Sequence, residues 1–184
     1  MSTLSPGNTV LRNFYGLRAL VAFLWVAVVV LTRSSPLIGA VLLVIYAAWD
    51  ALANYLDAQR NGGLSANPGQ RMNLGVSAAM SVLLAVGFVW GGPAGAVGVF
   101  GVWALLAGLF QLIVGIRRRK QGGQVFMMIS GAQSALAGGA FLFRAFSTTP
   151  HISDLAPYAA FGGFYFLLSA LWLSFRRQPQ VVAH

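Results

Sequence analysis

Long apolar runs, separated by short polar or proline-containing segments, dominate this chain of 184 residues. The runs show no strand-like alternation of polar and apolar positions, and each is 17 residues or longer. A helix of about 20 residues crosses a bilayer's hydrocarbon core of about 30 Å. We therefore predict an all-α integral membrane protein with six membrane-spanning helices, over residues 13–31, 37–57, 72–91, 95–116, 124–145 and 156–175.

The short connections between the runs predict antiparallel hairpins. Gly91-Gly92-Pro93 ends the third helix, because glycine and proline interrupt the helical hydrogen-bond ladder. Arg33-Ser34-Ser35-Pro36 separates the first two helices, and a longer polar stretch, 147–154, separates the last two.

Three prolines stand at equal intervals of 57 residues (36 to 93 and 93 to 150), each at the turn of one predicted hairpin. Other landmarks agree with this period: Gly16-Leu17-Arg18-Ala19 aligns with Gly75-Val76-Ser77-Ala78 and Gly131-Ala132-Gln133-Ser134. We predict one membrane domain over 1–184 with three repeats, about 13–57, 72–116 and 124–175. Each repeat enters and leaves on one side, so the hairpins would share one orientation around an axis along the membrane normal. Alternatively, duplication merely built a compact bundle.

Charge sets the predicted orientation. Only 8% of the residues are charged, against about 25% in soluble chains, and the formal net charge is +9. One predicted side carries Arg33 and Arg144, and the other carries the remaining ten basic residues: Arg12, Arg18, Arg60, Arg71, Arg117, Arg118, Arg119, Lys120, Arg176 and Arg177. Basic loops stay in the cytoplasm, so both termini are predicted to be cytoplasmic. The same rule explains the basic charge without a nucleic-acid partner.

The repeat resembles the HdeD-like family of bacterial inner-membrane proteins. The residues that carry the likeness best are Gly101-Val102-Trp103-Ala104-Leu105-Leu106-Ala107-Gly108-Leu109 and the following Arg117-Arg118-Arg119. The likeness spans nearly the whole chain, but Trp49-Asp50 stands where an apolar-small pair is expected. It implies repeated hairpins in the cytoplasmic membrane and a link to acid or general stress tolerance, with no established active site.

Two charges lie inside predicted spans and form a candidate ion site. Asp50 lies about seven residues from the cytoplasmic end of its helix, and Arg18 lies near the same side. A charge at mid-membrane depth costs on the order of 2.5–3.5 kcal/mol, so such residues are paired or functional. The alternatives are a proton or ion site, a structural Arg18–Asp50 pair, or Arg18 snorkelling to the headgroups with Asp57 as its partner.

Arg18, Ser77 and Gln133 occupy equivalent positions in the three repeats. If their helices line the axis, these side chains would form a polar layer, either as interhelical hydrogen bonds or as the constriction of a pathway. Rows of small residues predict close helix packing, within the bundle or between copies in a homo-oligomer. The rows are Gly131, Ala135 and Gly139, and Gly87 with Gly91.

Near the opposite surface, Arg144, His151 and Asp154 form a candidate pH-responsive cluster, because histidines change charge between pH 5 and 8. The alternative is that His151 is simply solvated. On the cytoplasmic side, the run Arg117, Arg118, Arg119 and Lys120 is predicted to fix topology and to contact anionic lipid.

Nothing in the sequence indicates an enzyme or a bound cofactor. The chain has no cysteine and two histidines, and it lacks a phosphate loop or a nucleophile–base–acid arrangement. The leading hypothesis is a non-enzymatic inner-membrane protein that acts through structural or regulatory helix contacts. The alternative is a small transporter or channel, with a pathway along the axis or near Arg18 and Asp50.

Overall fold

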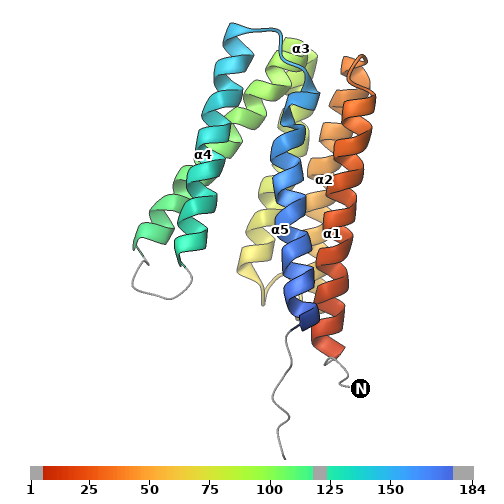
Figure 1. Cartoon of the computed structure of the whole chain (residues 1–184), viewed down its shortest axis with the longest axis vertical. Helices are drawn as coiled ribbons and strands as arrows, with labels where there is room; N and C mark the ends of the chain where they lie inside the picture. The colour runs from red at the N-terminus through yellow and green to blue at the C-terminus, as the bar shows by residue number, and fades with distance from the viewer. Residues whose placement is uncertain (1–5, 118–123, 176–184) are drawn as a thin grey trace, which may run out of the picture. The chain divides into compact units, whose positions relative to one another are not determined.

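The computed structural model describes residues 6–117 and 124–175, and all regular structure in these ranges is helical. The elements are α1 (Pro6–Leu31), α2 (Pro36–Arg60), α3 (Pro68–Arg117), α4 (Gln124–Ser147), the short 3₁₀ helix η1 (Ile152–Leu155) and α5 (Ala156–Phe175) (Figure 1). All six predicted helices lie within these elements. The third and fourth belong to a single 50-residue element, α3.

The chain forms two compact units. One comprises residues 1–28 and 156–184, and therefore most of α1 together with α5. The other comprises residues 29–155, with α2, α3, α4 and η1. This division does not coincide with the boundaries of the three repeats, which remain a prediction from the sequence.

Within the second unit, α3 reverses its direction at Gly92. This glycine has φ 57° and ψ −149°, a conformation that side chains with a Cβ rarely adopt, and Pro93 follows it. The two arms of α3 begin so close together that a Cβ on Gly95 would overlap the carbonyl group of Gly87. The predicted turn at Gly91-Gly92-Pro93 is therefore present, and it joins the arms without an intervening loop.

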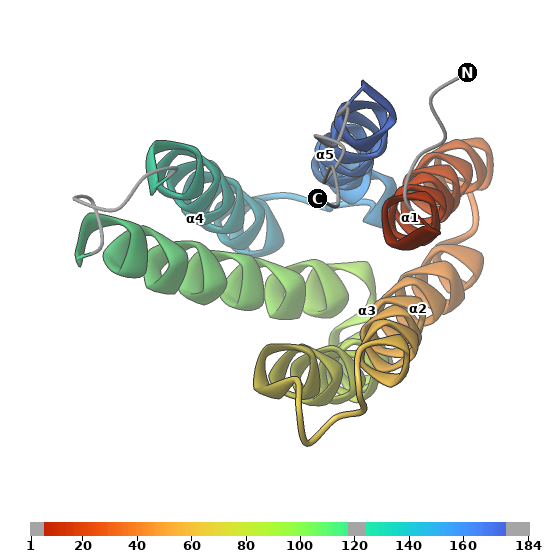
Figure 2. The same ribbon diagram turned by 90° about the horizontal axis from the view of Figure 1, so that it is seen from below.

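The arm of α3 before Gly92 lies beside α2, and the arm after it lies beside α4 (Figure 2). The α2 helix begins at Pro36 and is capped by Ser35, whose hydroxyl accepts a hydrogen bond from the Ile38 N–H. At its other end, Gly62 and Gly63 have positive φ and turn the chain toward α3. Gln70 of α3 donates to Asp57 of α2 (3.0 Å), which fixes this end of the pair.

The second arm of α3 meets α4 through glycines, without intervening side chains. A Cβ on Gly108 would lie 2.6 Å from the Gly131 carbonyl oxygen, and one on Gly138 would lie 2.7 Å from that of Gly101. Ala104 is fully buried between these two contacts along α3. The predicted close packing at Gly131, Ala135 and Gly87 is present within the chain, whereas Gly139 and Gly91 face open space, and packing between copies at these two positions remains a prediction.

Four helical segments of the described residues are long and apolar enough to cross a membrane: Thr9–Leu31, Pro36–Arg60, Pro68–Arg117 and Ile152–Phe175. Only 17% to 28% of their most apolar stretches is buried. Large apolar side chains such as Trp90 and Leu136 are exposed, by 86% and 76%. Apolar surface of this extent is unfavourable in water and favourable against lipid tails. These helices indicate a multi-pass membrane protein in contact with the bilayer.

Candidate functional site

The carboxylate of Asp50 is the centre of a polar cluster between α2 and α3. The Ser77 hydroxyl donates to its Oδ2 (2.7 Å), and the Asn54 side-chain amide donates to the same oxygen (3.1 Å). The Asn54 amide also donates to the backbone carbonyl of Asp50 (2.8 Å). Asn54 and Ser77 are buried, with 7% and 6% of their surfaces exposed. The cluster therefore satisfies polar groups that the apolar surroundings would otherwise leave without partners.

Local sequence explains this geometry. Asn54 follows Asp50 by four residues, so both lie on one face of α2, the face that meets the first arm of α3. Asp50 and Ser77 are among the residues predicted from the sequence, whereas Asn54 is not. The signal was available, because two polar residues at this spacing in an apolar helix predict a shared polar stripe.

The Asp50 carboxylate accepts hydrogen bonds from two neutral side chains, Asn54 in its own helix and Ser77 in α3. Chemically, such a group holds two helices in a fixed register, or it exchanges a proton or a cation if these donors move aside. The structure therefore connects Asp50 of the candidate ion site with Ser77 of the predicted polar layer.

Arg18 belongs to the unit of α1 and α5, and its planar guanidinium lies over an aromatic ring there. The guanidinium carbon is 4.3 Å from the centroid of Phe166 in α5 and 5.9 Å from that of Phe14. Tyr15 stacks on Phe166 as well, with 6.1 Å between centroids. Cation–π attraction of this kind stabilises a half-buried charge where water is scarce. The predicted pairing of Arg18 with Asp50 would join the two units and remains a prediction.

Gln133 lies on α4, next to Ser134, whose hydroxyl donates to the Ala104 carbonyl oxygen of α3 (3.1 Å). Ser77 instead is engaged with α2 through Asp50. The predicted polar layer of Arg18, Ser77 and Gln133 remains a prediction.

At the opposite end of the second unit, Asp154 holds the segment between α4 and α5. Its Oδ2 accepts a hydrogen bond from the Arg144 guanidinium and another from the His151 backbone N–H, both at 3.0 Å. The three residues of the predicted outer cluster thus lie together, but His151 contributes its backbone to these bonds. Its imidazole is exposed, and the proposed response to pH remains a prediction.

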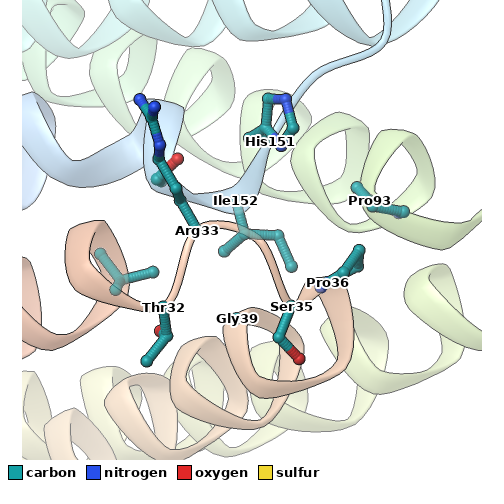
Figure 3. A pocket seen from close by; sticks show the side chains of 10 residues that line it. Thr32, Arg33, Ser35, Pro36, Gly39, Pro93, His151 and Ile152 are labelled. Atoms are coloured by element: carbon teal, nitrogen blue, oxygen red, sulfur yellow. The ribbon is translucent and has the colours of Figure 1, made fainter.

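A small pocket lies between the turns that carry the three evenly spaced prolines. We call it the outer pocket; Figure 3 shows it from close by. Pro36 lines it from the turn before α2, Pro93 from the reversal of α3, and His151 from the residues that directly follow Pro150. Its complete lining is Val29, Thr32, Arg33, Ser35, Pro36, Gly39, Pro93, His151, Ile152 and Ser153.

The pocket is closed on one side by a side chain that fits into a glycine notch. Ile152 is 4% exposed and packs against α2 at Gly39, where an added Cβ would lie 3.2 Å from the Ile152 Cβ. Because Ile152 is fixed in this way, its neighbours His151 and Ser153 are held at the pocket.

Of the predicted lipid-contacting basic run, Arg117 is the last residue of α3, while Arg118, Arg119 and Lys120 lie outside the described residues. No group of three or more metal-ligating side chains occurs within residues 6–117 and 124–175. In comparisons with known proteins, no protein-family model, curated protein or solved structure matches this chain.

Proposed function

We propose that the chain is a six-span bacterial inner-membrane protein built from three like-oriented hairpins, with both termini in the cytoplasm. On this proposal it is a non-enzymatic protein of the HdeD-like type. It would support acid or general stress tolerance through helix contacts with itself or with partner proteins.

The observation that carries this proposal is the outer pocket. Turns at equal sequence intervals, containing Pro36 and Pro93 and following Pro150, line one small space. Three hairpins of like orientation place their turns at the same membrane surface, as this arrangement requires. The glycine-to-backbone contacts between α3 and α4 support a structural role, because they leave little room for a pathway there.

Topology can be tested directly because the chain has no native cysteine. We expect Ser34→Cys, Ala94→Cys and Ser153→Cys, introduced one at a time, to react with a membrane-impermeant maleimide from the periplasmic side. Ser65→Cys, in the exposed connection between α2 and α3, serves as the matched control and should react only after permeabilisation. Labelling of the three outer turns from different sides would exclude like-oriented hairpins.

The physiological part is tested by deleting the gene and comparing survival at low pH, in high salt and under envelope stress. We expect reduced survival that the wild-type chain restores. Equal survival of the deletion strain under all three stresses would overturn the stress-tolerance proposal without affecting the topology.

The second candidate is transport, and the Asp50 cluster favours it. An acidic side chain in an apolar span is the usual proton or cation group of small transporters. Proteoliposomes loaded with a pH-sensitive dye would report proton flux, and Asp50→Asn should abolish it while the protein stays folded. Ser81→Ala is the matched control, because the Ser81 hydroxyl donates only locally, to the Ser77 carbonyl oxygen. Absence of flux with the wild-type protein would favour the structural role.

A further inference from the structure

We propose that the outer pocket is a binding site for a phosphate group, with Arg33 as the principal ligand and His151 as the second. The headgroup of a phospholipid and free inorganic phosphate share this chemistry. If the phosphate group belongs to a lipid, the inference rests on the proposed membrane placement.

Two separate segments bring hydrogen-bond donors to the pocket. Arg33 lines it from the turn between α1 and α2, and His151 lines it from the residues before η1. Both side chains are exposed, and Figure 3 shows them with the neighbouring pocket residues. A guanidinium presents several N–H donors in a plane, which suits the oxygens of a phosphate.

The nearest carboxylate does not neutralise this charge. Asp154 is occupied by Arg144 and by the His151 backbone N–H, and it does not line the pocket. The ion pair thus leaves the guanidinium of Arg33 as the charge that faces an incoming anion.

The N-terminal end of α2 adds to the attraction. This helix of 25 residues starts at Pro36, on the pocket wall, so the positive end of its dipole lies there. Ser35 caps this helix end by accepting a hydrogen bond from the Ile38 N–H.

Size and position fit a phosphate held at the mouth. The pocket encloses only enough space for roughly one water-sized group and is otherwise open to solvent. One phosphate oxygen would enter, and the others would face Arg33 and His151. The ends of apolar spans lie at headgroup depth, where lipid phosphates are found.

The test uses the purified full chain in a non-ionic detergent. Native mass spectrometry measures retention of phosphatidylglycerol and of a diacylglycerol with the same acyl chains but no phosphate, and equilibrium dialysis with radiolabelled phosphate measures the free anion. Four proteins are compared: wild type, Arg33→Gln, Arg33→Lys and Arg71→Gln. The matched control is Arg71, an exposed arginine in the first turn of α3, far along the helix from Pro93.

We expect Arg33→Gln to weaken phosphatidylglycerol binding on the order of tenfold, the usual effect of losing a charge-assisted hydrogen bond. Arg33→Lys should lose less affinity for phosphatidylglycerol, and Arg71→Gln should lose none. The binding of diacylglycerol should be the same in all three variants as in the wild type. Arg33-dependent binding of inorganic phosphate alone would support the site with the free anion as its ligand.

The proposal is overturned if Arg33→Gln binds phosphatidylglycerol and phosphate as well as the wild type does. It is also overturned if Arg33→Gln weakens diacylglycerol binding as much as phosphatidylglycerol binding. An unchanged thermal unfolding temperature verifies that each variant is folded. The assay uses neither cell survival nor membrane orientation, so its failure is distinguishable from failure of the proposed function.

Discussion

The two arms of α3 bind their neighbours in opposite ways. The second arm meets α4 through glycines whose missing side chains allow backbone-to-backbone approach, as at Gly108 and Gly131. The first arm meets α2 through polar side chains, with Ser77 donating to Asp50 at 2.7 Å. Both interfaces belong to the same unit.

This difference teaches how helices become specific partners when the surroundings are apolar. Lipid tails are as apolar as leucine, so burial of leucine alone gives helices little reason to associate. Close backbone approach gains dispersion energy over a long seam, whereas a hydrogen bond gains energy at one point and fixes the register. The first kind of interface should fail when volume is added, and the second when a polar atom is removed.

The largest expected effect is at the glycine seam. Gly138→Leu places a side chain into the backbone of Leu105 and should lower the free energy of unfolding by about 3 kcal/mol, at the upper end for overpacking. Denaturation by SDS in mixed micelles measures this. Gly139→Leu is the matched control, because the next residue faces open space and should tolerate the change. Equal losses for both variants would show that the seam is not selective.

Removing the interhelical hydrogen bond should have a smaller effect. Ser77→Ala deletes the donor to Asp50, and we expect a loss of about 0.6 to 1.7 kcal/mol, as for hydrogen bonds between membrane helices. A double-mutant cycle with Asp50→Ala isolates the pairwise coupling. Additive single losses would mean that the α2–α3 pair does not depend on this contact. Ser81→Ala, which removes a hydroxyl bonded within its own helix, is the control.

The notch at Gly39 combines features of both interfaces, since a side chain rather than a backbone fills the glycine gap. Gly39→Ala should lower the free energy of unfolding by about 1 kcal/mol, because Ile152 must move by a few tenths of an ångström. Gly75→Ala, at an open position, should be neutral or stabilising. A neutral Gly39→Ala would show that the segment after Pro150 adjusts freely.

The smallest effect is expected at the outer ion pair. Arg144 has half of its side chain exposed, so solvent screens its attraction to Asp154. Arg144→Gln should change the free energy of unfolding by about 1 kcal/mol at most. Asp154→Asn keeps an acceptor for the His151 N–H, so its effect on the free energy of unfolding should be similar to that of Arg144→Gln. A loss larger than that of Ser77→Ala for either variant would reverse the ranking of the polar contacts.

Much of this fold could be predicted because apolar run length and proline-glycine turns determine it locally. The reversal at Gly91-Gly92-Pro93 is an example, although the pattern could not tell which glycine adopts the positive φ, since both are sterically able to do so. Gly139 illustrates the limit for packing. It follows Gly138 directly, and only the rotation of α4 about its axis decides which of the two meets α3.

For the polar site, the sequence predicts which residues take part better than it predicts the contacts between them. Asp50 and Ser77 stood out as polar residues inside apolar runs, but the sequence suggested Arg18 as the carboxylate's partner because opposite charges attract at equal depth. The hydrogen bonds described for Asp50 come from Asn54 and Ser77. Which neutral donor reaches a buried carboxylate depends on the register between helices, and hydrophobic patterns do not encode it.

The glycine seam also restricts how this region can move. Gly101 and Gly108 face Gly138 and Gly131, so the notches repeat every seven residues along both helices. A piston-like displacement of α4 along α3 would bring side chains onto the opposite backbone until the next notches coincide, roughly 10 Å further on. Intermediate positions are sterically blocked. In any conformational change of this protein, α4 and the second arm of α3 should therefore move together as one rigid body. Displacements should occur where this pair of helices meets the rest of the chain.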